Sequence, residues 1–293
     1  MEKITVYGLP INPAHLINQL DKPSFCVSYG TRDRLGKQLN QAIDLVAEDG
    51  ILLVDNGAFS HWKSGGKMDD AYIDGFINWA KNIADRCPQA VVVIPDVIGG
   101  SWEQNQKLIE EWDYALSDRS MVMWHLDEPI NILIGRLKQG WPWLGIGSSG
   151  EYKDVGTEKW HGRMREVFAT IDAWERDWAQ PNGYVRPRIH LMRAQSQSHL
   201  YPVDSSDSTN LAVNHNRQSR KAGECFKSFA KRIDDKIQAS AGAAAEYQKL
   251  RPVTAGWEMD RWQDQHQMDL MSYKLQLDAE RIMAQIDAFQ LAA

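Results

Sequence analysis

Short apolar runs alternate with longer segments of helical periodicity along most of this chain, and this alternation constrains the fold more than any other feature. The runs, the last of which is weak, are Phe25–Tyr29, Ile51–Val54, Val91–Ile94, Met121–Trp124, Trp143–Ile146, Ile189–Met192 and Leu200–Val203. Continuous apolar runs flanked by turn residues are typical of strands in a parallel sheet that is covered on both faces.

Helical patterns lie between these runs. The segment Asp69–Cys87 places apolar residues at the i, i+3, i+4 and i+7 positions, and similar patterns lie in Trp102–Leu116 and around Met164 to Ile171. Repeated strand–helix alternation favours a barrel or a doubly wound sheet. No GxGxxG motif opens a helix after the first run, which disfavours a dinucleotide-binding unit. We therefore predict an α/β fold, a (β/α)8 TIM-like barrel with extra C-terminal helices.

The C-terminal part of the chain is expected to be helical. We place the barrel in residues 1–225 and a helical extension packed on it in residues 226–293. The extension begins with the Ala-rich segment Phe226 to Leu250, and a second helical stripe runs from Trp257 to Phe289. Packing on the barrel is the simpler interpretation of these stripes, and contact with another subunit is the alternative.

Composition limits the classes of partner. The chain has 33 basic and 39 acidic residues, a net charge of −6, so any polyanion would have to bind a local basic patch. Its three cysteines are scattered, which fits a reducing cytoplasm and indicates neither a zinc knuckle nor a disulfide framework. We expect no metal and no cofactor. We expect no signal peptide, because the N-terminus lacks a basic region followed by an apolar one, and no membrane partner, because the apolar runs fall far short of ~20 residues.

Polar residues directly follow several of the predicted strands. They are Asp55-Asn56-Gly57, Asp96, the group His125, Asp127 and Glu128, the turn Gly147-Ser148-Ser149, and Asp204. Residues that follow the strands of a barrel converge on one mouth. Carboxylates brought together there push each other's pKa values apart, so one can be an ionised nucleophile while its neighbour holds a proton. Aspartate suits attack at an anomeric carbon, where positive charge develops.

Single residues in this pattern also have ordinary structural interpretations. An isolated aspartate such as Asp207 is more often a helix cap or turn former. His125 and His190 have no spacing typical of metal ligands and fit hydrogen-bonded barrel histidines. Trp62 fits a core position, although its proximity to Asp55 would also allow it to line a mouth. The recurrence of acids after strands, rather than any one residue, favours a functional interpretation.

At these segments the chain resembles the tRNA-guanine transglycosylase superfamily. It is most similar to the DNA-acting branch, the DpdA-type 7-deazaguanine DNA transglycosylases of phages and bacteria. DNGAFS resembles the family's Asp-Ser-Gly-Gly-Phe-Gln segment, which implies that Asp55 lies beside the reacting base, with Asn56 and Gly57 contacting it. IPDVIGG is similar to the Phe-Asp-Glu segment, which implies that Asp96 reads the N1 and N2 edge of the purine.

Two further segments extend the resemblance, which covers Phe25 to Asn214. GIGSSGEY resembles the Gly-Gly-Leu-Ala-Val-Gly-Glu turn, so Gly147, Ser148 and Ser149 would offer backbone groups to the base. YPVDSSDS resembles the strand that carries the nucleophile, which implies that Asp204 has that role. The resemblance implies exchange of guanine in DNA for a 7-deazaguanine, in its 7-cyano or 7-aminomethyl form, through a covalent Asp–deoxyribose intermediate.

Two departures from the family pattern favour DNA over tRNA as substrate. The tRNA enzymes carry a CxCxxC…H zinc site and a Pro-Thr-Arg after the nucleophile, and this sequence has neither. A tRNA-guanine transglycosylase remains one alternative. A barrel glycoside hydrolase that uses two of the carboxylates Asp55, Asp96, Glu128 and Asp204 is another. A non-catalytic DNA-binding barrel is a third.

A basic stretch follows the expected nucleophile. Within Asn214–Arg232, the residues Arg217, Arg220 and Lys221 are expected to hold the DNA backbone, although a solvated helix face explains the same charges. The expected partners are therefore DNA and a free 7-deazaguanine base. A homodimer or accessory proteins are options between which the sequence does not decide.

Overall fold

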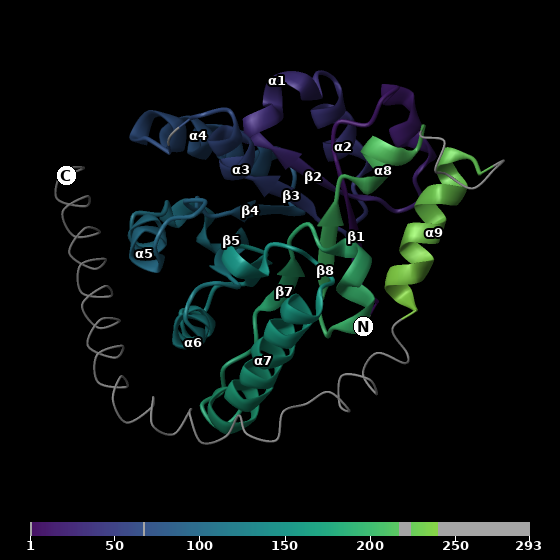
Figure 1. Ribbon diagram of the computed structural model, residues 1–293. Helices are drawn as coiled ribbons and strands as arrows, with labels where there is room; N and C mark the ends of the chain where they lie inside the picture. The colour runs from purple at the N-terminus through teal and green to yellow at the C-terminus, as the bar shows by residue number, and fades with distance from the viewer. Residues whose placement is uncertain (1, 67, 217–223, 240–293) are drawn as a thin grey trace.

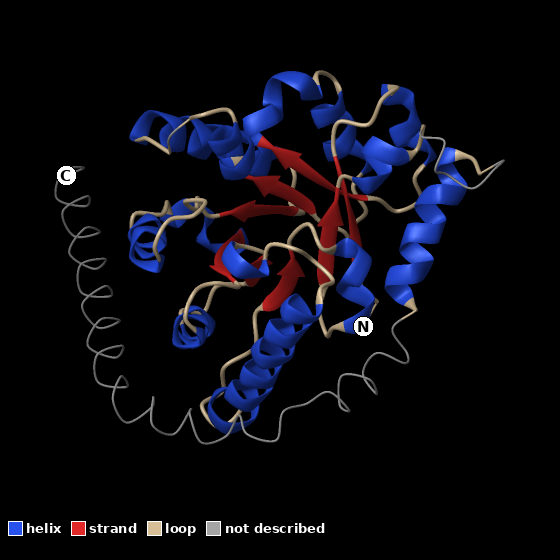
Figure 2. Cartoon of the chain, in the orientation of Figure 1, coloured by secondary structure: helices blue, strands red, loops and turns tan. Residues whose placement is uncertain are grey.

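The protein folds as a closed barrel of eight parallel strands surrounded by helices (Figures 1 and 2). The computed structural model describes residues 2–66, 68–216 and 224–239. Each strand pairs with the next along the chain, and β8 closes the barrel on β1 through the register Ile4–Ser205 to Tyr7–Ser208. The strands are β1 (Ile4–Gly8), β2 (Ser24–Ser28), β3 (Leu52–Asp55), β4 (Ala90–Val93), β5 (Ser120–His125), β6 (Trp143–Gly147), β7 (Arg188–Leu191) and β8 (Ser205–Ser208). The predicted fold class is confirmed.

Most of the predicted strands are present, and the ends of the sheet differ. The apolar runs between Phe25 and Met192 form β2 to β7, while β1 was not predicted. Leu200–Val203 is not a strand: Leu200 is the last residue of the 3-10 helix Gln195–Leu200, and the residues after it connect this helix to β8. Its apolar side chains pack in the core instead, where Tyr201 and Val203 are buried. Strand β8 reads Ser-Ser-Asp-Ser and has no apolar residue, so a search for apolar runs passes over it.

Helices follow the strands and cover the barrel. They are α1 (Arg32–Leu35), α2 (Gln38–Leu45), α3 (Ala58–Lys63), α4 (Asp70–Arg86), α5 (Trp102–Glu110), α6 (Ile130–Lys138), α7 (Glu158–Trp174), α8 (Asn210–Asn214) and α9 (Phe226–Gln238). Local sequence sets several of their starts. The side chain of Asp69 accepts a hydrogen bond from Tyr72 N at the start of α4, and Ser101 with Gln104 forms a capping box at α5.

Inside the barrel, apolar side chains fill the end where the strands begin. One cluster of buried residues occupies this interior: Val6, Ile51, Leu53, Val91, Val93, Met121, Met123 and Trp143. The guanidinium of Arg188 lies 4.4 Å from the centre of the Trp143 ring and covers this end of the cluster. Because apolar side chains fill this part of the interior, the carboxylates and histidines that face inward lie towards the carboxyl ends of the strands.

Helix α9, the first part of the helical segment that was expected to pack on the barrel, lies in the outer layer of the barrel. Figure 1 shows it beside β1 and β8. The Thr5 hydroxyl on β1 donates to Asp234 on α9 over 2.6 Å, and the Tyr7 hydroxyl donates to the carbonyl of Ala230 over 3.2 Å. Phe229 on the facing side of α9 is 5% exposed. The barrel therefore continues to Gln238, and the second expected helix, Trp257 to Phe289, lies outside the described residues.

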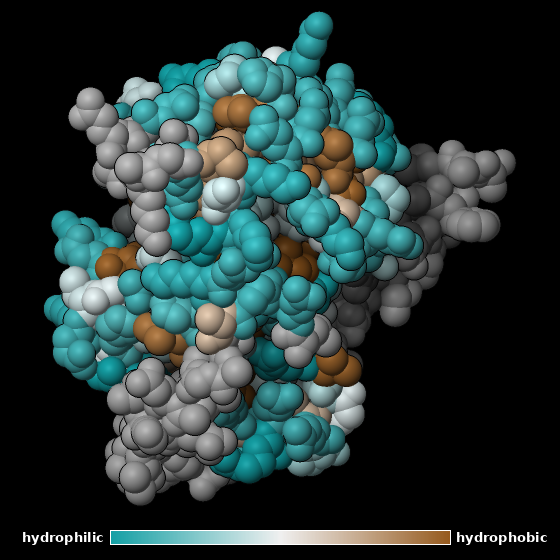
Figure 3. Space-filling view, turned by 90° about the vertical axis from the view of Figure 1, so that its right-hand side faces the viewer, coloured by the Kyte–Doolittle hydropathy of each residue, from teal (hydrophilic) through white to brown (hydrophobic). Residues whose placement is uncertain are grey.

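The surface of the barrel is largely polar on the face seen in Figure 3, where hydrophobic residues form separate small patches among hydrophilic ones. Within residues 2–66, 68–216 and 224–239, no helix has both the length and the apolar character needed to cross a membrane.

The packing of α9 predicts that its apolar face is essential for stability. We expect Phe229→Ala to lower the free energy of unfolding by about 3 kcal/mol, because the substitution removes a buried aromatic ring from the barrel wall. Lys231→Ala is the control, since its side chain is 72% exposed and its ion pair with Asp235 lies at the surface. Urea denaturation measures both variants. Equal stability of the two would show that α9 is a dispensable appendage.

Candidate active site at the carboxyl ends of the strands

Polar side chains from well-separated strands face the carboxyl-terminal mouth of the barrel. Asp55 and His125 are the last residues of β3 and β5, two positions after the inward-facing Leu53 and Met123. Alternate residues of a strand share a face, so both side chains point inward. Asp96 follows β4 by a short loop and is 6% exposed. The sequence therefore places these three residues at one mouth, as the acid-after-strand pattern predicted for Asp55 and Asp96.

His125 is held between two carboxylates. Its Nε2 lies 3.0 Å from Asp96 Oδ2, and its Nδ1 lies 3.2 Å from Glu128 Oε1. The ends of this row are also bonded, because Asn56 Nδ2 donates to Asp96 Oδ1 over 2.9 Å and Asn105 Nδ2 donates to Glu128 Oε1 over 3.1 Å. The result is a continuous buried row of hydrogen bonds, Asn56–Asp96–His125–Glu128–Asn105, which we call the mouth row.

The mouth row fixes the charges of its members. Burial opposes a charge on His125, but the hydrogen bonds to Asp96 and Glu128 outweigh it and raise the pKa of His125 to about 10. Burial likewise acts against ionisation of Asp96, yet His125 and Asn56 hold the pKa of Asp96 below its usual value. A protonated imidazole can donate from both ring nitrogens, as this geometry requires. At neutral pH His125 is a cation and Asp96 an anion.

The pKa of Asp55 is shifted in the opposite direction to that of Asp96. Burial raises the pKa of Asp55 to about 6, and the negative charges of Asp96 and Asp207 act in the same sense. The Ser28 hydroxyl and the Arg193 guanidinium oppose this rise without cancelling it. Two carboxyl groups at one mouth thus differ in protonation, and such a difference is typical of an acid–base site. Asp55 can take up or release a proton close to neutral pH.

Asp207 on β8 is held by the neighbouring strand β7. Its Oδ1 accepts a 2.6 Å hydrogen bond from the backbone N–H of Arg193 and lies 3.3 Å from Nε2 of His190. His190 is fully buried, and its Nδ1 lies 2.7 Å from the Ser205 hydroxyl. Arg193 has a φ of 56°, in the left-handed region that non-glycine residues seldom adopt. Within the described residues Asp207 Oδ2 accepts no hydrogen bond, so one oxygen of this fixed carboxylate is available.

The position expected for Asp204 was wrong. Asp204 precedes β8 and therefore lies at the amino end of the strands, where its Oδ2 accepts a 2.7 Å hydrogen bond from the backbone N–H of Ile189 and lies 3.6 Å from Arg186. Because the last strand begins after Asp204 rather than before it, the residue cannot reach the mouth. Asp207, which the sequence suggested was a cap or turn residue, lies on the inward face of β8 three residues later.

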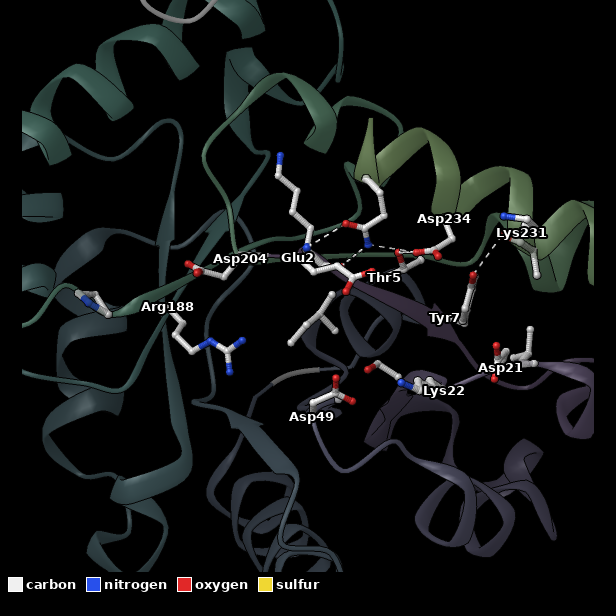
Figure 4. A pocket seen from close by; sticks show the side chains of 18 of the residues that line it. Glu2, Thr5, Tyr7, Asp21, Lys22, Asp49, Arg188, Asp204, Lys231 and Asp234 are labelled. Carbon is white, nitrogen blue, oxygen red and sulfur yellow. Dashed lines mark hydrogen bonds between the residues drawn. The ribbon is translucent and has the colours of Figure 1, made fainter. Parts of the chain in front are cut away.

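Asp204 lines a cavity of about 1260 Å³ at the amino end of the barrel (Figure 4). Basic residues such as Arg188 and acidic residues such as Asp49 and Asp234 face it together, so its charges are mixed. The cavity lies at the opposite end of the strands from Asp55 and Asp96. Enzymes with this fold carry their active sites at the carboxyl ends of the strands, and we therefore place the candidate site at the mouth and not in this cavity.

The glycine-rich segments act mainly through close packing. Gly57 has a φ of 76°, and a Cβ at this position would overlap Gly30. A Cβ on Gly147 would lie 2.8 Å from the His125 ring, so glycine leaves the room that the mouth row needs. Ser148 accepts a 2.9 Å hydrogen bond from the Trp160 indole, and the Ser149 hydroxyl donates to Asp127. The side chains of Ser148 and Ser149 are therefore engaged in the loop rather than directed at a ligand.

Several site residues were missed or undervalued in the sequence. His190 and Asp207 occupy inward positions of β7 and β8, and strand alternation would have revealed both had β8 been recognised. Arg193 has no such signal, because its role depends on contacts across the barrel. The proposed DNA-contacting residues Arg217, Arg220 and Lys221 lie outside the described residues. Of the same basic stretch, Lys231 pairs with Asp235 and Arg232 pairs with Glu224.

Comparison with known proteins identifies no relative. No protein-family model, no curated protein and no solved structure matches the chain. Among the described residues, no group of three or more His, Cys, Asp and Glu side chains is arranged to hold a metal ion.

The mouth row predicts a large stability cost for loss of its cation. We expect His125→Gln to lower the free energy of unfolding by about 3 kcal/mol at pH 7, because it leaves the buried Asp96 and Glu128 without their shared charge. Since the pKa of His125 is raised from 6.5 to about 10, its stabilisation is complete below pH 6.5 and is lost as the pH rises through 10. The variant should therefore be closest to the unaltered protein above pH 10.

Urea denaturation between pH 6 and pH 10.5 measures this difference. The exposed His15 supplies the control, and His15→Gln should leave stability unchanged throughout. A loss in His125→Gln that stays constant over the whole range would mean that packing, and not charge, accounts for it.

Proposed function

We propose that the protein is a DNA-guanine transglycosylase, which exchanges guanine in DNA for a 7-deazaguanine base such as the 7-cyano or 7-aminomethyl form. The observation that carries the proposal is the pairing of Asp55 with Asp207 at one mouth. Asp55 exchanges a proton near pH 6, while Asp207 is held rigidly with one oxygen available. A proton carrier and a fixed carboxylate at one site suit a double displacement at an anomeric carbon. The order of the resembling segments along the chain points to the same chemistry.

In the first displacement, the free oxygen of Asp207 attacks C1′ of a deoxyguanosine. The bond between C1′ and N9 of guanine breaks, and its electron pair passes to the leaving base. The protonated carboxyl of Asp55 gives its proton to that base, so neutral guanine departs and Asp55 becomes an anion. Deoxyribose is then bound to Asp207 as an ester. The hydrogen bond from Arg193 N–H to Oδ1 holds the carboxylate in place and leaves Oδ2 as the attacking oxygen.

The second displacement reverses these steps with a different base. The incoming 7-deazaguanine gives its N9 proton to the Asp55 carboxylate, and N9 attacks C1′. The ester bond to Asp207 breaks and its electron pair returns to the carboxylate, so the enzyme regains its starting protonation. A proton carrier with a pKa of about 6 serves both directions, because neither of its forms is strongly disfavoured near neutral pH.

Asp96 is proposed to read the edge of the purine. Each of its oxygens already accepts one hydrogen bond, from Asn56 and from His125, and each retains a second lone pair. Because His125 keeps Asp96 ionised, the carboxylate accepts only, which suits the N1–H and N2–H donors of guanine and of 7-deazaguanines. The target base would have to leave the helix to reach this depth, since C1′ and the base edge are covered in a duplex.

The choice of DNA rests on the sequence around the revised nucleophile. Asp207 is followed by Ser208 and Thr209, and not by the Pro-Thr-Arg of the tRNA enzymes, and the chain has no CxCxxC zinc pattern.

The assignment of Asp207 predicts which variant loses the covalent intermediate. The unaltered protein, incubated with a guanine-containing DNA strand while released guanine is removed, should give a protein–DNA adduct on a denaturing gel. We expect Asp207→Asn to form none, because an amide is a poor nucleophile. The matched control is Asp204→Asn, which should keep at least half of the adduct because its side chain lies at the opposite end of the barrel. An adduct in Asp207→Asn that is missing in Asp204→Asn would reverse the assignment.

The pKa of Asp55 predicts the pH dependence of the first displacement. The proton that Asp55 donates is present below pH 6 and absent above it, so the rate of adduct formation should fall about tenfold per pH unit above pH 6. Asp55→Asn should be slow and should lose this dependence. Single-turnover rates between pH 5 and pH 8.5 measure both proteins. A rate that rises over this range would show that Asp55 acts as a base in this step.

A further inference from the structure

Two aromatic side chains beside the mouth are exposed. Phe59 and Trp62 lie on α3, which starts immediately after the Asp55-Asn56-Gly57 segment, and their ring centroids are 6.1 Å apart. Phe59 is 37% exposed and Trp62 is 56% exposed, whereas Trp124 and Trp160 are fully buried. A large apolar ring is thus left in solvent next to Asp55 instead of being buried in the core. What distinguishes this pair from a singly exposed aromatic residue is that the two rings lie together beside a polar mouth.

A cation reaches these rings from the far side of the barrel. Arg193 follows β7, and β7 is four strands away from β3 in the closed order, which is the greatest separation that the barrel allows. Even so, the guanidinium carbon lies 4.0 Å from the centre of the Phe59 ring. The Arg193 side chain therefore spans the mouth. Lys63, also on α3, is exposed beside Trp62.

Neither cation is neutralised by a partner within the part of the chain that the structure describes. No carboxylate among these residues lies at ion-pairing distance from Arg193 or Lys63, although Arg193 lowers the pKa of Asp55 and of Asp96 through space. The mouth beneath is rich in carboxylates, which repel a phosphodiester backbone. Positive charges at the rim are what would let a polyanion approach these carboxylates.

We propose that Phe59, Trp62, Lys63 and Arg193 form a docking site for an unpaired nucleotide of DNA next to the reacting one, and we call these residues the rim platform. Trp62 stacks on the base of that nucleotide, and Arg193 and Lys63 bind its phosphates. Aromatic stacking combined with basic side chains is how proteins hold single strands without reading sequence. The neighbour of an extruded base has one open face, so the platform fits the geometry that base exchange requires. The inference rests on the proposed function and adds a substrate preference to it.

The rim platform implies a preference for strands over smaller substrates. A free nucleoside or an oligosaccharide offers the mouth a sugar but has no flanking base for Trp62 and no phosphate for Arg193. The enzyme should therefore act on oligonucleotides and not on deoxyguanosine. The cations Arg193 and Lys63 distinguish this mouth from that of a barrel glycoside hydrolase that acts on neutral sugars, because such substrates carry no phosphate.

The test measures binding apart from chemistry. The parent protein is full-length Asp207→Asn, with folding checked by circular dichroism, so no adduct contributes to the signal. Its affinity for a labelled single-stranded deoxyoligonucleotide with one guanine is measured by fluorescence anisotropy between 50 and 300 mM salt. Trp62→Ala should weaken binding about tenfold, and Trp62→Phe should restore most of the affinity because a smaller ring still stacks. Arg193→Gln should reduce the slope of log affinity against log salt by about 0.7 for each phosphate that the arginine neutralises.

Matched controls use exposed residues away from the mouth. Tyr114→Ala removes an aromatic side chain that is 63% exposed, and Lys107→Gln removes a surface cation on α5, so both should bind within twofold of the parent. If Trp62→Ala and Arg193→Gln also stay within twofold, or if the parent does not bind the strand, the rim platform is wrong. Tighter binding of the same sequence made as RNA would overturn the assignment of DNA.

Failure of the platform and failure of the proposed function give different results. With Asp207 intact, base exchange that proceeds in Trp62→Ala and Arg193→Gln with an unchanged KM for the strand would leave the transglycosylase standing and overturn the docking site. Binding that depends on both residues, in a protein that exchanges no base, would support the docking site and overturn the enzyme.

Discussion

The buried cation at His125 is the interaction on which the rest of the mouth depends. Carboxylates gathered in a protected site repel one another and resist ionisation, unless a positive charge lies among them. His125 supplies that charge from the end of β5 and binds Asp96 on one side and Glu128 on the other. With Asp96 kept ionised, the field that it exerts helps to raise the pKa of Asp55 to about 6. The His125 imidazolium therefore keeps Asp96 ionised as a hydrogen-bond acceptor, while Asp55 can take up and release a proton.

The interior of the barrel is divided to make this arrangement stable. Apolar side chains and the Arg188–Trp143 contact fill the amino end, so the polar groups at the other end rest on a packed floor. Strand β8 contributes no apolar residue, and pairing with β1 and β7 stabilises it instead, together with side-chain hydrogen bonds to β7. His190 joins Ser205 and Asp207, and it is fully buried. This strand contributes little to the apolar core, but its hydrogen bonds hold the carboxylate of Asp207, the proposed nucleophile, in place.

The sequence predicted the barrel because β2 to β7 are apolar and regularly spaced, and it predicted that Asp55 and Asp96 lie at the mouth because each comes just after an apolar run. It failed where the interior is polar. The apolar segment Leu200–Val203 packs in the core without forming a strand, and the strand Ser205–Ser208 has a sequence typical of a turn. Because the strand was predicted a few residues too early, Asp204 was expected at the mouth, where the structure has Asp207. The position of Arg193 over Phe59 joins residues far apart in the chain, and no local pattern indicates it. The charge of His125 likewise depends on partners that only the fold brings together.

The claim that the mouth exchanges bases is tested most directly by following a labelled base into DNA. The protein is incubated with a guanine-containing DNA strand and an isotopically labelled 7-deazaguanine, and the DNA is then digested to nucleosides for mass spectrometry. The account predicts a labelled 7-deazaguanine deoxynucleoside together with an equal amount of released guanine. Unchanged DNA, or guanine released without any incorporation of the label, would contradict it.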